Sequence, residues 1–355
     1  MSLIDYGWND SWAERLSEAD VEGGIAARVV AEHRELFRVH TGSEEIAARI
    51  AGRLRHVALS SAELPAVGDW VVIDSADERG DALIQNILPR RSVFSRKAAG
   101  KRTDEQIVAA NVDTVWIVSP ADADRNPARI ERYLTMVWES GASPVVVLSK
   151  ADLSPAPERT IAEVAERVIG APSHAVSAIS GAGLDELEQY LAPGSTIALL
   201  GPSGAGKSTL INRLAGQEVM RTAEVRDSDS KGRHTTTHRQ LVLLPSGALL
   251  LDTPGLRELQ LWSAEEGLEK SFADIEALAA GCRFSDCGHD SEPGCAVQAA
   301  IRAGTLDLAR FESFRKLEKE LAYLERKQDV RADLAERQRW KEITKDYRRW
   351  FKKRG

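Results

Sequence analysis

The N-terminal quarter of the chain consists of short runs separated by turn residues. The runs are either apolar or alternate between apolar and polar residues. Glycines at positions 42, 68 and 80 fall between these runs. Runs of this length, bounded by turn signals, are typical of β-strands. They are Ile25–Val30, Leu36–His40, Ile46–Ile50, Trp70–Asp74 and Ala82–Leu88. We therefore expect a small β-barrel over residues 21–92, preceded by an N-terminal extension of residues 1–20.

Two segments beside the barrel have simpler patterns. Trp8, Trp12 and Leu16 recur at four-residue spacing, which puts them on one face of a short helix. We expect this face to dock against the body of the protein, with an aromatic contact to a partner as the alternative. Arg90–Arg102 is basic and contains Gly and Ala, so we interpret it as a linker to the next domain.

The middle of the chain has continuous apolar runs that end in glycine or polar residues. Examples are Val145–Leu148, Thr196–Leu200 and Leu249–Leu251. Such runs are typical of parallel strands that are buried on both faces. We therefore expect a doubly wound α/β domain over residues 103–270. A C-terminal domain over residues 271–355 follows, in which Phe311, Phe314, Leu317, Leu321 and Leu324 form a helical stripe.

The strand Thr196–Leu200 leads into a complete G-x-x-x-x-G-K-[ST] motif, and a helical pattern follows. This context is the one in which the motif binds phosphate. Glycines let backbone N–H groups approach phosphate oxygens, and the helix N-terminus adds partial positive charge. We expect Lys207 to reach the outer phosphates and Ser208 to bind Mg²⁺. The predicted phosphate loop comprises Gly201, Pro202, Ser203, Gly204, Ala205, Gly206, Lys207, Ser208 and Thr209.

Two further segments are predicted to supply the other groups that bind Mg²⁺ and the terminal phosphate. An apolar strand ends in Asp252-Thr-Pro-Gly255, where P-loop enzymes place a second Mg²⁺ group and a backbone N–H for the terminal phosphate. Between this strand and the phosphate loop, Arg221–His238 is polar and contains His234 and Thr236. A Thr236 hydroxyl can complete the Mg²⁺ shell only while the γ-phosphate is present, so this segment is a switch candidate.

Base recognition is predicted upstream of the phosphate loop. Val145–Leu148 ends in Ser149, Lys150, Ala151 and Asp152, a near match to the guanine motif N-K-x-D. The Asp152 carboxylate can accept two N–H groups of guanine, which adenine cannot supply, and the Lys150 stem can lie over the base. Ser149 stands where the motif has Asn, so one orienting amide is absent.

A second loop for the base follows another short strand and contains Ser177 and Ala178. Both base segments therefore precede the phosphate loop, although most GTPases have the opposite order. A circular permutation of this kind is physically allowed, because ligands bind outside the carboxyl ends of the strands and this crevice survives a change of connections.

Three cysteines and one histidine form the second strong motif. Cys282, Cys287, His289 and Cys295 lie in one short segment, and the chain has no other cysteine. Four N and S ligands with no open position are typical of a structural, tetrahedral Zn²⁺ site. No signal peptide or apolar membrane span is evident in the sequence, so we expect a cytoplasmic protein, in which disulfides are rare.

Charge is unevenly distributed along the chain. The net charge is −7 over 355 residues, which argues against a protein that coats nucleic acid uniformly. From Glu312 onward there are 15 Lys or Arg and 9 Asp or Glu, a local charge of +6 that leaves −13 for the remainder. Beyond Arg337 the basic residues alternate with Trp340, Tyr347 and Trp350. Basic residues attract phosphate and aromatic faces can stack on bases, so we interpret this tail as an RNA contact.

The order of motifs, the run Gly232-Arg-His-Thr-Thr-Thr and the Cys-x₄-Cys-x-His-x₅-Cys cluster resemble the ribosome small-subunit-dependent GTPases of the RsgA (YjeQ) family. The resemblance spans roughly residues 21–330. It implies that the barrel is an OB-fold, that the α/β domain is a circularly permuted GTPase and that the cluster holds zinc. It also implies a role in late assembly of the small ribosomal subunit, with hydrolysis stimulated by that subunit. In the barrel, Arg28, Arg38, Arg53 and Arg55 are candidates for RNA contact, with solvated surface charge as an equal alternative.

We therefore expect a monomeric GTPase that hydrolyses GTP to GDP and phosphate with bound Mg²⁺, one structural Zn²⁺ and no membrane contact. Leu256 stands where Ras-like enzymes have a water-positioning Gln. The catalytic group must come from elsewhere, and His234 is the candidate beside Thr236 and Lys207. The alternative is a nucleotide-gated RNA-binding module in which hydrolysis is incidental. A P-loop kinase is disfavoured by the guanine motif.

Overall fold

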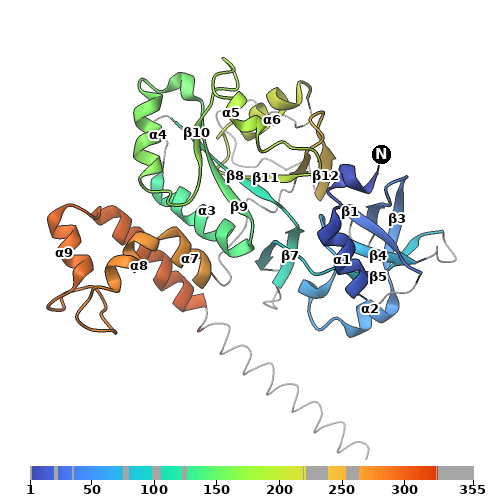
Figure 1. Cartoon of the computed structure of the whole chain (residues 1–355), viewed down its shortest axis with the longest axis horizontal. Helices are drawn as coiled ribbons and strands as arrows, with labels where there is room; N and C mark the ends of the chain where they lie inside the picture. The colour runs from blue at the N-terminus through green and yellow to red at the C-terminus, as the bar shows by residue number, and fades with distance from the viewer. Residues whose placement is uncertain are drawn as a thin grey trace, which may run out of the picture.

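The computed structural model describes residues 2–19, 23–33, 36–74, 80–97, 105–121, 126–218, 220, 239–252, 264–324 and 326. Figure 1 shows three parts: a β-barrel, a central sheet flanked by helices, and a group of helices after residue 264, which we call the helical module. The barrel and the helical module lie at opposite ends of the central part (Figure 1). Within the described residues, no helix is long and apolar enough to cross a membrane.

The barrel closes because β1 pairs with strands on both of its sides. Its strand order is β1-β2-β3-β5-β4, and β1 pairs again with β4. Val29, Val39 and Ile84 are fully buried in its interior. The strands are β1 (Ile25–His33), β2 (Leu36–His40), β3 (Glu45–Ile50), β4 (Trp70–Asp74) and β5 (Ala82–Ile87), with α2 (Gly52–Val57) and η2 (Ser61–Glu63) between β3 and β4. The predicted barrel is confirmed, and each predicted run overlaps one of its strands.

The N-terminal extension docks on the barrel, as predicted. Its elements are η1 (Leu3–Tyr6) and α1 (Asp10–Glu18). The side chain of Asn9 caps α1 by accepting the N–H of Trp12 at 3.3 Å. The rings of Trp8 and Trp12 lie 4.8 and 5.9 Å from that of Trp70 on β4, and Trp12 is fully buried. Trp8 precedes the helix, so only part of the predicted helical face is helical.

The segment predicted as a linker contains a strand, so that prediction is wrong for its described residues. β6 (Val93–Lys97) and β7 (Glu105–Ala110) form a separate antiparallel hairpin. Phe94 on β6 is buried, and this apolar anchor is hard to see among basic neighbours. Arg90 is also structural, because its guanidinium binds the buried Asp69 carboxylate at 2.8 Å.

The central sheet has the order β10-β9-β8-β11-β13-β12, in which only β12 is antiparallel to its neighbour. One face packs on α3 and α4 through Leu134 and Val164, and the other packs on α5 and α6 through Leu187 and Ile211. Helices on both faces explain the continuous apolar runs and confirm a doubly wound domain. The strands are β8 (Thr114–Pro120), β9 (Ser143–Ser149), β10 (Ser173–Ala175), β11 (Thr196–Leu200), β12 (Arg239–Leu243) and β13 (Leu249–Asp252). The helices are α3 (Pro127–Ser140), η3 (Ala151–Leu153), α4 (Pro157–Ala165), α5 (Asp185–Glu188) and α6 (Lys207–Ala215).

Arg28 joins the barrel to the central sheet from a buried position. Its side chain donates to Thr196 Oγ1 at 2.9 Å, to the carbonyl of Asn111 at 3.1 Å and to the carbonyl of Tyr6. The guanidinium lies over the ring of Trp70 and is 2% exposed, and burial lowers the pKa of Arg28 to about 10. Arg28 therefore cannot face RNA, and that prediction is wrong because sequence alone does not reveal a buried arginine.

The helical module has its own apolar core. Phe311, Phe314, Leu317 and Leu321 are buried against Phe272, so the predicted stripe is confirmed over helical residues 308–324. The other helices are α7 (Glu265–Ser271), α8 (Ala273–Ala279) and α9 (Ala296–Ala303). The basic aromatic tail beyond Arg337 lies outside the described residues.

A buried ion network joins the helical module to the central part. Arg310 binds Asp274 at 2.7 and 2.8 Å and lies 3.3 Å from the Glu131 carboxylate on α3. It also donates to the carbonyls of Arg167 and Ser271. The Arg310 and Glu131 side chains are 4% and 1% exposed. These contacts fix the helical module on α3 and on the residues after α4.

Candidate nucleotide site and metal centre

The phosphate loop follows β11 and passes directly into α6. Gly201 has φ +145°, and a Cβ at this position would lie 2.2 Å from the carbonyl oxygen of Val118. Gly204 and Gly206 also have positive φ, and Gly206 is the N-cap of α6. The predicted strand, loop and helix are therefore present, with glycine where the backbone requires it.

Lys207 is held by the loop itself. Its ammonium donates to the carbonyls of Gly201 at 2.8 Å and Pro202 at 2.6 Å, and the residue is 7% exposed. Of the other predicted phosphate contacts, Ala205 is buried and Ser208 half-buried, while Ser203 and Thr209 are exposed. The loop thus positions one cation at the N-terminal end of α6, where backbone N–H groups also favour an anion.

The predicted base motif lies at the end of strand β9, which β8 separates from β11 in the sheet. Lys150 has a left-handed φ of +57°, which turns the chain into η3 with Asp152 exposed on it. The N–H of Ala151 donates to the carbonyl of Val176 at 3.0 Å. Both base segments are therefore bonded to each other, at the same edge of the sheet as the phosphate loop.

Ser149 makes a contact that the sequence analysis missed. Its hydroxyl donates to the carbonyl of Ala205 in the phosphate loop at 2.6 Å, and it is 5% exposed. This bond ties the base strand to the phosphate loop. The replacement of Asn by a smaller hydroxyl residue was the available signal, because a short hydroxyl side chain can donate to a nearby carbonyl.

The loop with Ser177 and Ala178 is closed by its own hydrogen bonds. Ser177 is fully buried; its N–H donates to the carbonyl of Ala182 at 2.9 Å, and its hydroxyl accepts the N–H of Ser180 at 3.1 Å. Ala178 is half-buried beside it. The loop is thus held as a tight turn after β10.

The remaining predicted residues are placed only in part. Asp252 is the last residue of β13 and pairs with Gln240 of β12, so its backbone lies at the end of the strand beside β11. His234, Thr236 and Gly255 lie outside the described residues, as does Leu256. The structure therefore brings together the phosphate loop and the base segments of the predicted site.

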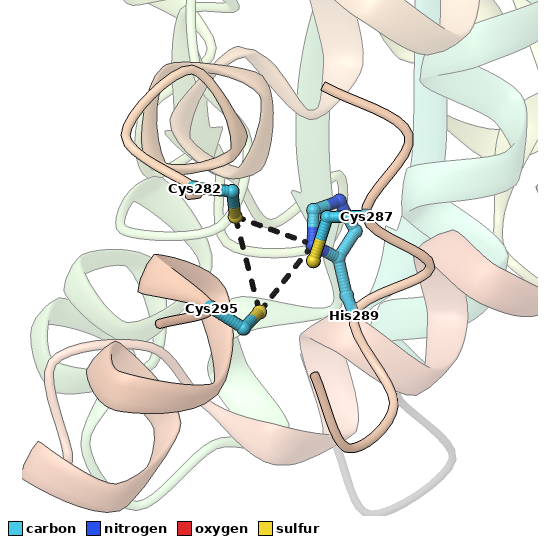
Figure 2. Close-up of side chains that lie close together, drawn as sticks. All are labelled: Cys282, Cys287, His289 and Cys295. Atoms are coloured by element: carbon cyan, nitrogen blue, oxygen red, sulfur yellow. Dashed lines mark hydrogen bonds between the residues drawn. The ribbon is translucent and has the colours of Figure 1, made fainter. Parts of the chain in front are cut away.

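The cysteine and histidine cluster converges on one point (Figure 2). All four ligand atoms lie within 4.8 Å of one another. Cys282 Sγ is 3.6 Å from His289 Nδ1 and 3.9 Å from Cys295 Sγ, and Cys295 Sγ is 3.5 Å from His289 Nδ1. A Zn–S distance of about 2.3 Å requires about 3.8 Å between ligand atoms of a tetrahedron. The donor set and its spacing therefore fit a metal ion of this kind.

Glu292 supports the ligand loop, a role that no motif in the sequence predicts. Its carboxylate accepts the N–H groups of Gly288, Asp290 and Ser291 at 2.9, 2.9 and 3.0 Å. Hydrogen bonds from backbone N–H groups, including its own, hold the pKa of Glu292 below its ordinary value. These bonds shape the turn that carries His289, whose φ is +57°. An acidic residue between the second pair of ligands was the only available signal.

Comparison with known proteins gives consistent family matches. A family model described as RsgA GTPase matches residues 87–262, and one described as 50S ribosome-binding GTPase matches residues 196–343. The small ribosomal subunit biogenesis GTPase RsgA of Opitutus terrae is 48% identical over 97% of this chain and 96% of that protein. Its counterpart from Methanosarcina acetivorans is 42% identical over 98% and 93%.

Solved structures agree with the sequence relatives. YjeQ from Thermotoga maritima has 28% identity and a TM-score of 0.62, with 84% of this chain and 99% of that chain covered. YloQ, described as a circularly permuted GTPase, has 24% identity and a TM-score of 0.58 over 85% and 96%. The base strands β9 and β10 precede the phosphate loop in the chain and share one sheet with β11, from which only β8 separates them, so the permuted fold is confirmed. Identity of this extent over almost the whole chain shows that the protein belongs to the RsgA family of small ribosomal subunit biogenesis GTPases.

Proposed function

We propose that this protein hydrolyses GTP to GDP and phosphate on the small ribosomal subunit and assists late maturation of that subunit. The observation that carries the proposal is the joined site, in which Ser149 links the base strand to a complete phosphate loop. A loop that only bound phosphate would have no need of a guanine-type motif beside it. The names of the full-length relatives support the ribosomal partner.

We assign the nucleotide contacts as the sequence predicts them. Gly201–Thr209 bind the phosphates, and Ser149–Asp152 with Ser177 and Ala178 surround the base. Ser208, Asp252 and Thr236 bind the Mg²⁺ that accompanies GTP, and the Gly255 N–H faces the terminal phosphate. Guanine specificity rests on the Asp152 carboxylate, because an anionic acceptor strengthens two parallel N–H bonds.

Hydrolysis requires stabilisation of charge on the transferring phosphoryl group and an oriented water molecule. Lys207 supplies the charge, from the position that the loop carbonyls set. We assign Thr236 to the phosphate-dependent Mg²⁺ contact and His234 to the orientation of water, which Leu256 cannot perform. Docking on the subunit would bring Thr236 and His234 into position beside Lys207. Hydrolysis by the isolated protein is therefore expected to be slow.

One structural Zn²⁺ per chain is proposed for Cys282, Cys287, His289 and Cys295. When bound, it cross-links the loop before α9 to the end of α8 and needs no open coordination position. Cys282 Sγ accepts the N–H of Ala296 and Cys295 Sγ accepts the N–H of Gln298, both at 3.4 Å. Such bonds favour thiolate ligands.

We further propose that the protein acts as a monomer in the cytoplasm, where small subunits are assembled. We divide the chain into an extension (1–20), an OB-fold (21–92), the permuted GTPase domain (103–270) and the zinc-binding domain with its basic tail (271–355).

The deciding experiment measures GTP hydrolysis by the full-length protein with and without purified small subunits. We expect subunits to raise turnover at least about a hundredfold, the lower end of what one transition-state contact supplies. Equal turnover in both conditions would overturn the proposal. If a non-hydrolysable GTP analogue failed to trap the protein on the subunit, the alternative of incidental hydrolysis would gain support.

A further inference from the structure

Strand β12 pairs with both the barrel and the central sheet. On one edge it pairs with β13, from Gln240↔Asp252 to Leu243↔Leu249. On its other edge it pairs with β1, through Ala31↔Gln240 and Glu32↔Arg239. The barrel and the nucleotide-binding sheet are therefore one continuous hydrogen-bonded sheet. Gln240 takes part in both pairings, opposite the strand end that carries Asp252.

Arg239, the first residue of β12, binds two other elements. Its Nη1 donates to Glu32 Oε2 on β1 at 2.8 Å and to the carbonyl of Ile107 on the β6–β7 hairpin at 3.5 Å. The Arg239 and Glu32 side chains are only 12% and 19% exposed. Water therefore screens this pair less than it screens an ion pair at the surface. One guanidinium thus joins the barrel, the hairpin and the central sheet.

Arg239 is also close in sequence to the predicted hydrolytic residues. It directly follows residues 221–238, which include Thr236 and His234. Strand β1 of the barrel also contacts β11, because Arg28 on β1 donates to Thr196 Oγ1 on β11 at 2.9 Å. β11 ends at the phosphate loop, and β13 ends at Asp252. Strand β1 is therefore bonded to both strands that lead to the phosphates.

We propose that Arg239 is a positioning residue that couples the barrel and the hairpin to the nucleotide site. Subunit contacts on the barrel or hairpin would act through the Glu32–Arg239 pair on β12 and, through the pairing of β12 with β13, on Asp252 at the nucleotide site. Energetic coupling between distant sites requires such a chain of bonded, rigid elements. This inference rests on the proposed function, because it concerns stimulation by the small subunit.

The test compares Arg239→Gln and Glu32→Gln with a matched control, Glu45→Gln. The control removes a charge from the Arg38–Glu45 pair, which has a similar length of 2.7 Å on the same barrel but joins β2 to β3. Basal turnover, subunit-stimulated turnover and subunit affinity are measured for full-length, zinc-loaded proteins. Melting temperature identifies a variant that fails to fold. Because the pair has two members, Glu32→Gln remains informative if Arg239→Gln is unstable.

We expect both variants of the pair to lose about fivefold or more of the stimulated rate, the lower end of coupling between protein sites. Their basal turnover and subunit affinity should stay within about twofold of the original values, and Glu45→Gln should behave as the original protein does. The double exchange Glu32→Arg with Arg239→Glu should recover part of the stimulation, because it restores an opposite-charge pair.

Three results would overturn the coupling role. Normal stimulation of both variants would show that the pair transmits nothing. A parallel fall of stimulation and subunit affinity would show a docking role, and an equal loss in Glu45→Gln would show a general effect of barrel charge. If subunits do not stimulate even the unaltered protein, the proposed function itself fails and this inference fails with it.

Discussion

At the scale of single residues, the phosphate site concentrates its chemistry in two neighbouring side chains. The carbonyls of Gly201 and Pro202 fix the Lys207 ammonium, so its charge is already oriented. Lys207→Ala removes this charge and Ser208→Ala removes the proposed Mg²⁺ ligand. We expect each to lower GTP turnover at least about a hundredfold, with melting temperature and zinc content unchanged. Near-normal turnover in either variant would contradict the assignment of this loop.

Recognition of the guanine base is expected to depend on one carboxylate, that of Asp152. Asp152→Asn should weaken GTP binding by about 2 kcal/mol, because hydrogen bonds to a charged group are the stronger ones. It should also shift preference toward XTP, whose ring offers an acceptor to the new amide. Affinities for GTP, XTP and ATP provide the measurement, and Asp185→Asn on exposed α5 serves as the control. Unchanged selectivity would rule out the role of Asp152.

His234 is expected to act only when the subunit is bound. His234→Ala should lose about a hundredfold of the stimulated rate, in the usual range for a group that assists proton transfer or orients water. GTP binding and subunit association should be retained. Stimulated turnover and subunit affinity must be measured together, with His238→Ala as a control in the same segment. A proportional loss of both quantities would indicate that His234 serves docking.

Residue types in a motif could be predicted from sequence, but their partners could not. The phosphate loop and the cysteine cluster have fixed spacings, so their residues were identified directly. Arg28 was placed on the surface because most arginines are exposed, whereas its partners, two carbonyls and the Thr196 hydroxyl, come from three distant segments. Ser149 likewise bonds a loop 56 positions away. Such contacts depend on the packing of elements, which no local pattern encodes.

At the scale of elements, the proposed metal would tie the ligand loop to the end of α8. Cys287→Ser should abolish zinc binding and lower the melting temperature of the helical module, because it removes one of the four ligands that would cross-link the loop before α9 to the end of α8. Affinity for GTP should stay within about twofold, since the nucleotide site lies in another domain. Metal analysis and unfolding curves test this, with Ser285→Ala in the same loop as the control. Protein purified without chelators but containing no zinc would remove the metal from this interpretation.

The elements that could be predicted were those with a clear pattern of apolar residues. The run Thr196–Leu200 matches β11 in full, and the stripe from Phe311 to Leu321 is a buried helical face. β6 was missed because its basic residues outweigh one buried aromatic, and its hairpin is stabilised by contacts on the partner strand β7. Closure of the barrel through β1 and β4 could not be predicted either, because strand pairing is a property of the assembled sheet.

At the scale of the whole molecule, the Arg310 network joins the helical module to the nucleotide-binding part. Arg310→Met would leave the buried Glu131 carboxylate with much weaker pairing, which should cost about 3–5 kcal/mol of unfolding free energy at neutral pH. Arg132→Met is the control, because the Arg132–Glu320 pair at the same interface is about a third exposed and should cost about 1 kcal/mol or less. Chemical denaturation measures both values, and equal costs would contradict the special role of Arg310.

The stability lost in Arg310→Met should depend on pH in a defined direction. Burial holds the pKa of Glu131 above its ordinary value, although Arg310 and Arg167 oppose this shift. A carboxyl with a raised pKa in the folded state costs stability as pH rises above the unfolded value, so the cost shrinks as pH falls. Loss of Arg310 raises this pKa further. The penalty of Arg310→Met should therefore be smaller at about pH 5 than at about pH 7.

The continuous sheet has a consequence for solubility. An edge strand presents unpaired N–H and C=O groups that can pair with another chain. Here the barrel closes on itself and β1 covers the start of β12, so the outer edge of the combined sheet is β10, a strand of three residues. A short edge is a common natural defence against aggregation. The same two residue pairs that join β1 to β12 thus also keep the start of β12 from pairing with a second copy of the chain.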